Sequence, residues 1–144
     1  MKARHPLHVA SALVLGLALS ACQGLEHVEE CRAVARLVNP VLTGVKQKQS
    51  QSPASSSTYR AIALEYERAA GASTLLKVRT KRVSEALGDY QRVLREAARD
   101  ARVFSDALDS KDEGRIAAAR AAAARTVRHE GGALSRMESV CRPR

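Results

Sequence analysis

The sequence predicts an all-α fold, an up-down-up-down antiparallel four-helix bundle. Apolar residues recur at helical spacing through most of the chain after residue 25, and no segment alternates apolar and polar residues as a strand would. Polar or capped breaks divide this region into four segments, which favours helices joined by short connections. A chain of 144 residues suffices for one domain with its own core, but not for two comfortable ones.

Composition limits both the core and the partners of this domain. The chain contains one Phe, three Tyr and no Trp, so Ala, Val and Leu must supply most of the core. The formal net charge of +9 is compatible with an anionic partner such as a membrane surface.

Residues 25–48 form the first expected helix. Apolar residues recur there in two interleaved sets spaced by seven, a pattern typical of one side of a bundle helix. The sets are Val28, Ala35 and Leu42, and Cys31, Val38 and Val45. Pro40 removes a backbone hydrogen bond, so it is expected to kink the helix or split it.

The second expected helix begins near Thr58, after a polar, Ser-rich loop over residues 49–57. The residues on its predicted core face are Ile62, Tyr66, Ala69, Ser73 and Leu76. Its end, over residues 78–81, is the least defined boundary. A continuous helix there would reduce the four helices to three.

The third expected helix has the most regular core face, with apolar residues spaced alternately by four and three. These residues are Val83, Leu87, Tyr90, Leu94, Ala97, Ala101, Phe104 and Leu108. Ser110-Lys111-Asp112-Glu113 resembles a capping box, which predicts the start of a fourth helix there.

The fourth expected helix ends at Cys141 and carries one polar residue, Glu130, on its core face. The apolar residues of that face are Ile116, Ala123, Val127, Leu134, Met137 and Cys141. Gly131-Gly132 is expected to loosen the helix and rotate Glu130 out of the core. The alternatives are an interhelical pair with an Arg and, last, a catalytic acid.

The first 21 residues have the layout of a secretory signal peptide. Lys2 and Arg4 lie in a short basic start, and an apolar segment over residues 9–19 is too short to span a bilayer. The motif Leu19-Ser20-Ala21-Cys22 follows. It resembles the lipobox of bacterial lipoproteins, an aliphatic residue and two small residues before a cysteine.

That resemblance implies that the Cys22 thiol receives a diacylglycerol and that cleavage makes Cys22 the new N-terminus. Because Gln23 rather than Asp follows, it also implies the periplasmic face of the outer membrane over the inner membrane. The expected organisation is a signal peptide over residues 1–21, a lipid tether over 22–25, a bundle over 26–141 and a basic tail over 142–144.

An exported domain places Cys31 and Cys141 in an oxidising compartment. In an up-down bundle, the start of the first helix and the end of the fourth lie at the same end, so the two cysteines are expected to form a disulfide. Free thiols are one alternative. The other is a zinc or copper site formed by His27, Glu30 and Cys31, with Cys141. His129-Glu130 resembles the start of an HExxH motif, but residue 133 is Ala, which favours a surface or structural role for His129.

No motif for a nucleophilic serine, a phosphate loop or a dinucleotide fold is present, so we expect a non-enzymatic protein without a cofactor. The expected role is structural, or the binding of an unidentified protein in the cell envelope. The alternatives are a small ligand- or metal-binding bundle and an accessory or inhibitory subunit of an envelope enzyme. Export makes nucleic acid an unexpected partner.

A short tether at Cys22 would hold one end of the bundle near the membrane. Six basic residues are expected at that end: Lys77, Arg79, Lys81, Arg82, Arg142 and Arg144. The opposite end is expected to be acidic, with Asp106, Asp109, Asp112 and Glu113. The hypothesis is that the basic residues dock on anionic lipid headgroups. The alternative is that they are ordinary solvated helix ends.

Overall fold

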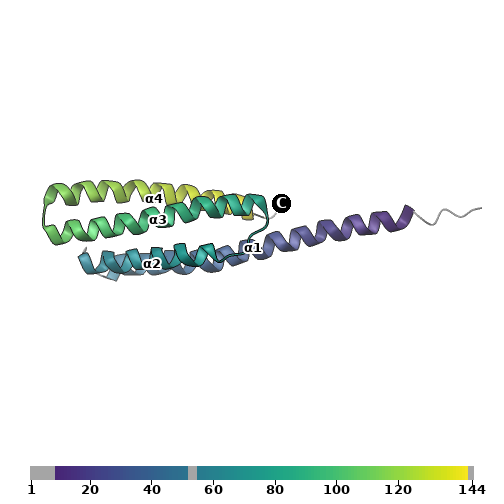
Figure 1. Cartoon of the computed structure of the whole chain (residues 1–144), viewed down its shortest axis with the longest axis horizontal. Coiled ribbons are helices and arrows are strands. Elements are labelled where there is room, and N and C mark those ends of the chain that lie inside the picture. Colours follow the sequence, from purple (N-terminus) through teal and green to yellow (C-terminus); the bar gives the residue numbers. More distant parts are fainter. Residues whose placement is uncertain (1–8, 52–54, 143–144) are drawn as a thin grey trace, which may run out of the picture.

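The computed structural model describes the backbone of residues 9–51 and 55–142, and the side chains of residues 24–50 and 55–142. It contains four helices and, in these residues, no strand (Figure 1). The helices are α1 (Val9–Gln51), α2 (Ser56–Thr74), α3 (Lys81–Ser110) and α4 (Glu113–Cys141). The predicted all-α four-helix fold is confirmed, and α2 and α3 are separate helices.

Successive helices run antiparallel. The α2–α3 connection and the end of α4 lie at one end of the bundle, and the α3–α4 connection lies at the other (Figure 1). Helix α3 packs extensively against both α2 and α4. Helix α1 packs mainly against α2 and has few contacts with α3 and α4. The seam between α1 and α4 is therefore sparsely packed.

The core face of α3 is the one predicted. Leu108 is half-buried, and the other seven predicted residues are buried. A second row widens this face, since α3 is covered by a neighbour on two sides. The additional buried residues are Ala86, Val93, Ala98, Ser105 and Ala107.

Helix α1 is longer than predicted, because it begins at Val9 and continues through Pro40 to Gln51. Pro40 therefore does not split it. Both Pro40 and Arg36, whose carbonyl would otherwise accept a helical bond, are exposed to water, which reduces the penalty for the missing bond. The N-terminal part of α1 projects beyond the bundle (Figure 1).

The predicted loop over residues 49–57 is shorter than expected. Helix α1 occupies its start, and α2 begins at Ser56, with residues 52–54 outside the described part. The hydroxyl of Ser55 accepts a hydrogen bond from the Thr58 amide at 3.2 Å. This N-cap explains why the Ser-rich segment starts a helix earlier than its composition suggested.

One of the two core sets predicted for α1 is wrong at two of its three positions, whereas its third member, Leu42, is half-buried and packs against the core. Val28 and Ala35 are exposed, and the buried residues on this helix are Glu30, Val34, Val38, Val41 and Val45. A helix with one main neighbour buries a single flank, and the flank that carries Val28 and Ala35 stays uncovered. The set containing Cys31, Val38 and Val45 is correct, although Cys31 is only half-buried.

Two predictions for α4 need correction. Its N-cap is Asp112 rather than Ser110, because the Asp112 carboxylate accepts a hydrogen bond from the Arg115 amide at 3.0 Å. Val127 is 62% exposed and does not belong to the core. The buried residues of α4 are Ala119, Thr126, Glu130, Ala133 and Met137.

Glu130 is thus inside the bundle, contrary to the expectation that Gly131-Gly132 would rotate it outward. The helix continues regularly through both glycines, which are themselves exposed. The two glycines therefore do not turn the Glu130 side chain away from the core.

In the part of the chain that the structure describes, no helix has an apolar stretch long enough to cross a bilayer.

Candidate functional site

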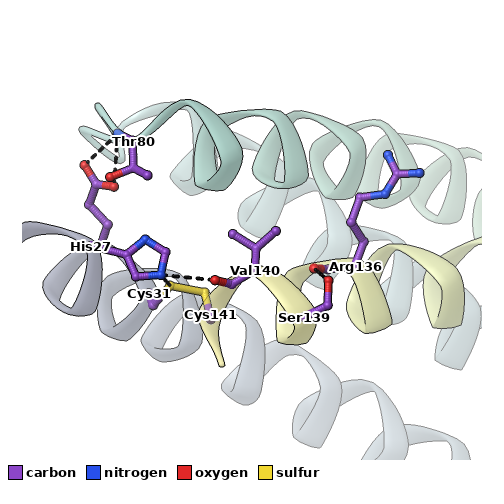
Figure 2. The surroundings of a disulfide bond; sticks show 8 residues. His27, Cys31, Thr80, Arg136, Ser139, Val140 and Cys141 are labelled. Atoms are coloured by element: carbon purple, nitrogen blue, oxygen red, sulfur yellow. Dashed lines mark hydrogen bonds between the residues drawn. A yellow bond between two sulfur atoms is a disulfide. The ribbon is translucent and has the colours of Figure 1, made fainter. Parts of the chain in front are cut away.

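Most of the predicted site residues gather at the end of the bundle where α1 meets the last turn of α4. There the structure joins Cys31 to Cys141 in a disulfide, as predicted, with a Cα–Cα distance of 5.6 Å (Figure 2). The bond spans a sequence separation of 110 residues. It connects two helices that have few mutual contacts, so it holds together a seam that side-chain packing closes poorly.

His27 supports the same junction. Its Nε2 lies 3.1 Å from the carbonyl oxygen of Val140, and 3.9 Å from the sulfur of Cys31 (Figure 2). A carbonyl can only accept, so Nε2 carries the hydrogen in this contact. His27 thereby satisfies one of the last carbonyls of α4, which have no partner within the helix.

Glu30 connects α1 to the start of α3. Its side chain is buried, and its Oε1 accepts a hydrogen bond from the Arg79 amide at 2.6 Å. The Thr80 amide donates to Oε2 at 3.2 Å. Thr80 is the N-cap of α3 but makes no side-chain capping bond. Glu30 therefore supplies, from another helix, the negative charge that a helix N-terminus favours.

These contacts control the ionisation of Glu30. Burial raises the pKa of this carboxyl, but the hydrogen bonds from Arg79 and Thr80 and the nearby His27 ring together lower it below its usual value. Hydrogen bonds to the charged form stabilise that form. Glu30 is thus a buried carboxylate held ionised by its donors.

The three residues of the alternative metal site are each bound to a different protein group. The Cys31 sulfur is in the disulfide, the Glu30 oxygens accept backbone amides, and His27 faces Val140. In the searched part of the chain, no group of three or more His, Cys, Asp or Glu side chains is placed to hold a metal ion. The arrangement is that of a structural junction.

The five predicted basic residues that the structure describes are exposed at this end, but carboxylates accompany two of them. Arg79 lies 3.6 Å from Glu26, and Lys81 lies 3.9 Å from Glu85. Of the five predicted basic residues whose side chains are described, the other three have no carboxylate within 4.0 Å. They are Lys77, Arg82 and Arg142.

Arg144 and the side chain of Cys22 lie outside the described residues. Cys22 itself lies in α1, eight residues before Glu30, which corresponds to about 12 Å along a helix axis.

A second polar cluster, which the sequence reasoning did not assemble, lies in the core. The Tyr66 hydroxyl donates to Oε2 of Glu130 at a long 3.5 Å. Within the described residues, the other oxygen, Oε1, has no partner, and neither does the hydroxyl of Tyr90. The sequence signals for this cluster were the positions of Tyr66, Tyr90 and Glu130 on the predicted core faces of their helices.

Burial dominates the chemistry of this cluster. It raises the pKa of Glu130, which the hydrogen bond from Tyr66 only partly opposes. Burial and the proximity of Glu130 also raise the pKa values of Tyr66 and Tyr90 well above their usual range. His129, the neighbour of Glu130 in sequence, is exposed and lies 3.5 Å from Glu96, in agreement with the expected surface position.

No protein-family model matches this chain, and no curated protein or solved structure matches it either.

Proposed function

We propose that this protein is a lipid-anchored lipoprotein of the bacterial cell envelope, with a structural or protein-binding role and no enzymatic activity. The observation that carries the proposal is the motif Leu19-Ser20-Ala21-Cys22, placed directly after a short apolar segment with a basic start. Acyl chains on Cys22 would anchor the chain, because each buried methylene contributes about 0.8 kcal/mol. The absence of Asp after Cys22 favours the periplasmic face of the outer membrane.

The disulfide end of the bundle supports this proposal. A disulfide between the first and last helices suits the oxidising compartment into which a signal peptide would deliver the chain. Processing before Cys22 would leave few residues between the lipid and the junction at His27, Glu30 and Cys31. The same end of the bundle would therefore face the membrane.

Basic residues at that end would orient the bundle on anionic headgroups. Each Lys or Arg near an anionic surface contributes about 1 kcal/mol, and the effect decays within a Debye length. Because Glu26 and Glu85 accompany Arg79 and Lys81, we assign most of the attraction to Lys77, Arg82 and Arg142.

The lipid anchor is tested by substituting Cys22. Cys22→Ala should abolish acylation and leave an unprocessed or soluble chain, as measured by intact mass and membrane fractionation. Ser20→Ala, which keeps a small residue in the motif, is the matched control and should be processed normally. Acyl chains on the Cys22→Ala protein would overturn the assignment.

Headgroup docking is tested with an unacylated chain that begins at residue 22 and carries Cys22→Ser. Binding to vesicles should require anionic lipid and weaken in high salt. The triple change of Lys77, Arg82 and Arg142 to Gln should abolish it. The triple change of Arg115, Arg120 and Arg125 to Gln removes as many charges from exposed positions on α4 and should retain binding. Equal binding to neutral vesicles, or equal loss in both variants, would argue against docking.

A protein partner in the envelope is tested by cross-linking of the acylated protein in intact cells. A partner that is itself an enzyme, and whose activity changes on addition of this protein, would favour an accessory or inhibitory subunit over a structural role.

A further inference from the structure

A small cavity of about 50 Å³ lies beside Glu130, among α2, α3 and α4. Gln49, near the end of α1, completes its rim. The cavity therefore lies towards the end of the bundle opposite the disulfide, beside the sparse contacts of α1. The apolar and aromatic residues that line it are Tyr59, Ile62, Tyr66, Ala97, Ala101, Phe104, Ala123 and Val127.

Two carboxyl groups line the same cavity, Asp100 from α3 and Glu130 from α4. Oδ2 of Asp100 accepts a hydrogen bond from the Thr126 hydroxyl at 2.6 Å, which fixes its side chain against α4. Glu130 is only 9% exposed, and in the described structure its Oε1 has no donor. A buried acceptor without a partner destabilises a fold, so an unpaired carboxyl oxygen in a core requires an explanation.

A ligand that partnered Glu130 from this cavity would have to donate hydrogen bonds and fit among aromatic rings. Tyr59 and Phe104 meet edge to face, with ring centroids 4.5 Å apart, and the Tyr66 ring also lines the cavity. Aromatic faces attract cations, and a primary ammonium group carries three donors for the facing carboxyl oxygens. The volume suits a few water molecules or one small head group.

We propose that this cavity binds the head group of a primary alkylammonium ion, with the alkyl chain extending outward past Ala123 and Val127. Val127 is 62% exposed, so an apolar chain in this direction would cover apolar surface now in contact with water. The proposal does not depend on the lipid anchor, because every residue involved belongs to the bundle itself.

Binding of the cation should be linked to a proton. Burial raises the pKa of Glu130, so the ammonium ion stabilises an ionised form that is otherwise disfavoured, and the Glu130 proton leaves to solvent. The other titratable groups near Glu130 are Tyr66 of α2, and Tyr90 and Asp100 of α3, whereas α1 contributes the uncharged Gln49. Affinity should therefore increase with pH until Glu130 is ionised without ligand.

The test is a titration of the full-length protein with n-butylammonium chloride, followed by amide chemical shifts. Perturbations should concentrate around residues 59–66, 97–104 and 123–130, and n-butanol should bind at least tenfold more weakly. Glu130→Gln, which keeps the side-chain shape, should weaken butylammonium binding at least tenfold. Glu96→Gln changes an acid of α3 that pairs with His129 and should bind as the parent protein does.

The proposal fails if butylammonium and butanol bind equally, since the site would then recognise only the alkyl chain. It also fails if Glu130→Gln retains full affinity, or if no local perturbation occurs at millimolar butylammonium. In the last case the cavity holds water alone.

Discussion

The two buried glutamates of this protein are both largely hidden from water, but their pKa values shift in opposite directions. Glu30 is 6% exposed and Glu130 is 9% exposed. Burial raises the pKa of both carboxyls, yet the net shift is downward for Glu30 and upward for Glu130. The comparison shows that the hydrogen-bond donors around a buried carboxyl, together with the depth of its burial, decide the direction in which its pKa shifts.

The hydrogen-bond donors differ because Glu30 meets the N-terminus of a neighbouring helix and Glu130 meets the middle of its neighbours. Glu30 faces the first amides of α3, which have no partner within their own helix. Glu130 lies within α4 and faces the middle of other helices, where backbone amides are already bonded. Only side chains can donate there, and among the described residues Tyr66 does so at 3.5 Å.

The largest expected effect comes from removing the covalent bond beside Glu30. Replacement of both Cys31 and Cys141 by Ala should lower the free energy of unfolding by about 4–5 kcal/mol, because a loop of about 100 residues is no longer closed in the unfolded chain. Urea denaturation measures this change. Hydrogen exchange should accelerate more in α1 than in α3, which α2 and α4 still cover. A loss below about 1 kcal/mol would show that side-chain packing alone closes the seam.

The next effect tests whether Glu30 stabilises the fold. Glu30→Ala leaves two backbone amides without their acceptor and should lower the free energy of unfolding by about 3 kcal/mol. The matched control is Glu29→Ala, which removes an exposed pair with Arg32 and should change stability by less than about 1 kcal/mol. Equal effects of the two substitutions would contradict the assigned cap of α3.

Substitution of Glu130 should raise the stability of the fold, whereas substitution of Glu30 should lower it. Its folded pKa is raised above its unfolded value of about 4.3, so the parent protein loses stability as pH rises through this value and up to the folded pKa. Glu130→Gln removes that loss and should be more stable than the parent by about 1 kcal/mol at pH 8. Thermal unfolding at pH 4 should show little difference between them. If Glu130→Gln were less stable than the parent protein at pH 8, the Glu130 carboxylate would not be a destabilising buried charge.

The smallest effect is the acid response of Glu30. Its folded pKa is lowered, so the stability from its ionised form is present above about pH 4.3 and is lost as pH falls through the folded pKa. Denaturation at pH 5 and pH 3 should show a loss about 1 kcal/mol larger for the parent than for Glu30→Gln. The same slope in both proteins would assign the acid response to other carboxyls.

The predictability of the fold differs between helices for a physical reason. The core face of α3 follows from its sequence because two neighbours cover a wide, regularly spaced apolar face. On α1 the sequence offers two adjacent apolar sets, and periodicity cannot show which flank meets a neighbour. Val28 and Ala35 were therefore misplaced.

The contacts at the candidate sites also differ in how far the sequence predicts them. The sequence alone determines the helical segments, their order and the end at which Cys31 and Cys141 meet, since periodicity is local and an up-down topology fixes which helix ends coincide. The structure decides that α2 and α3 are separate helices. Only the tertiary structure decides that Glu30 caps α3 and that Glu130 faces Tyr66, because those contacts join residues 49 to 64 positions apart. A carboxyl's partners depend on the rotation of each helix against the next, and helical spacing does not specify that rotation.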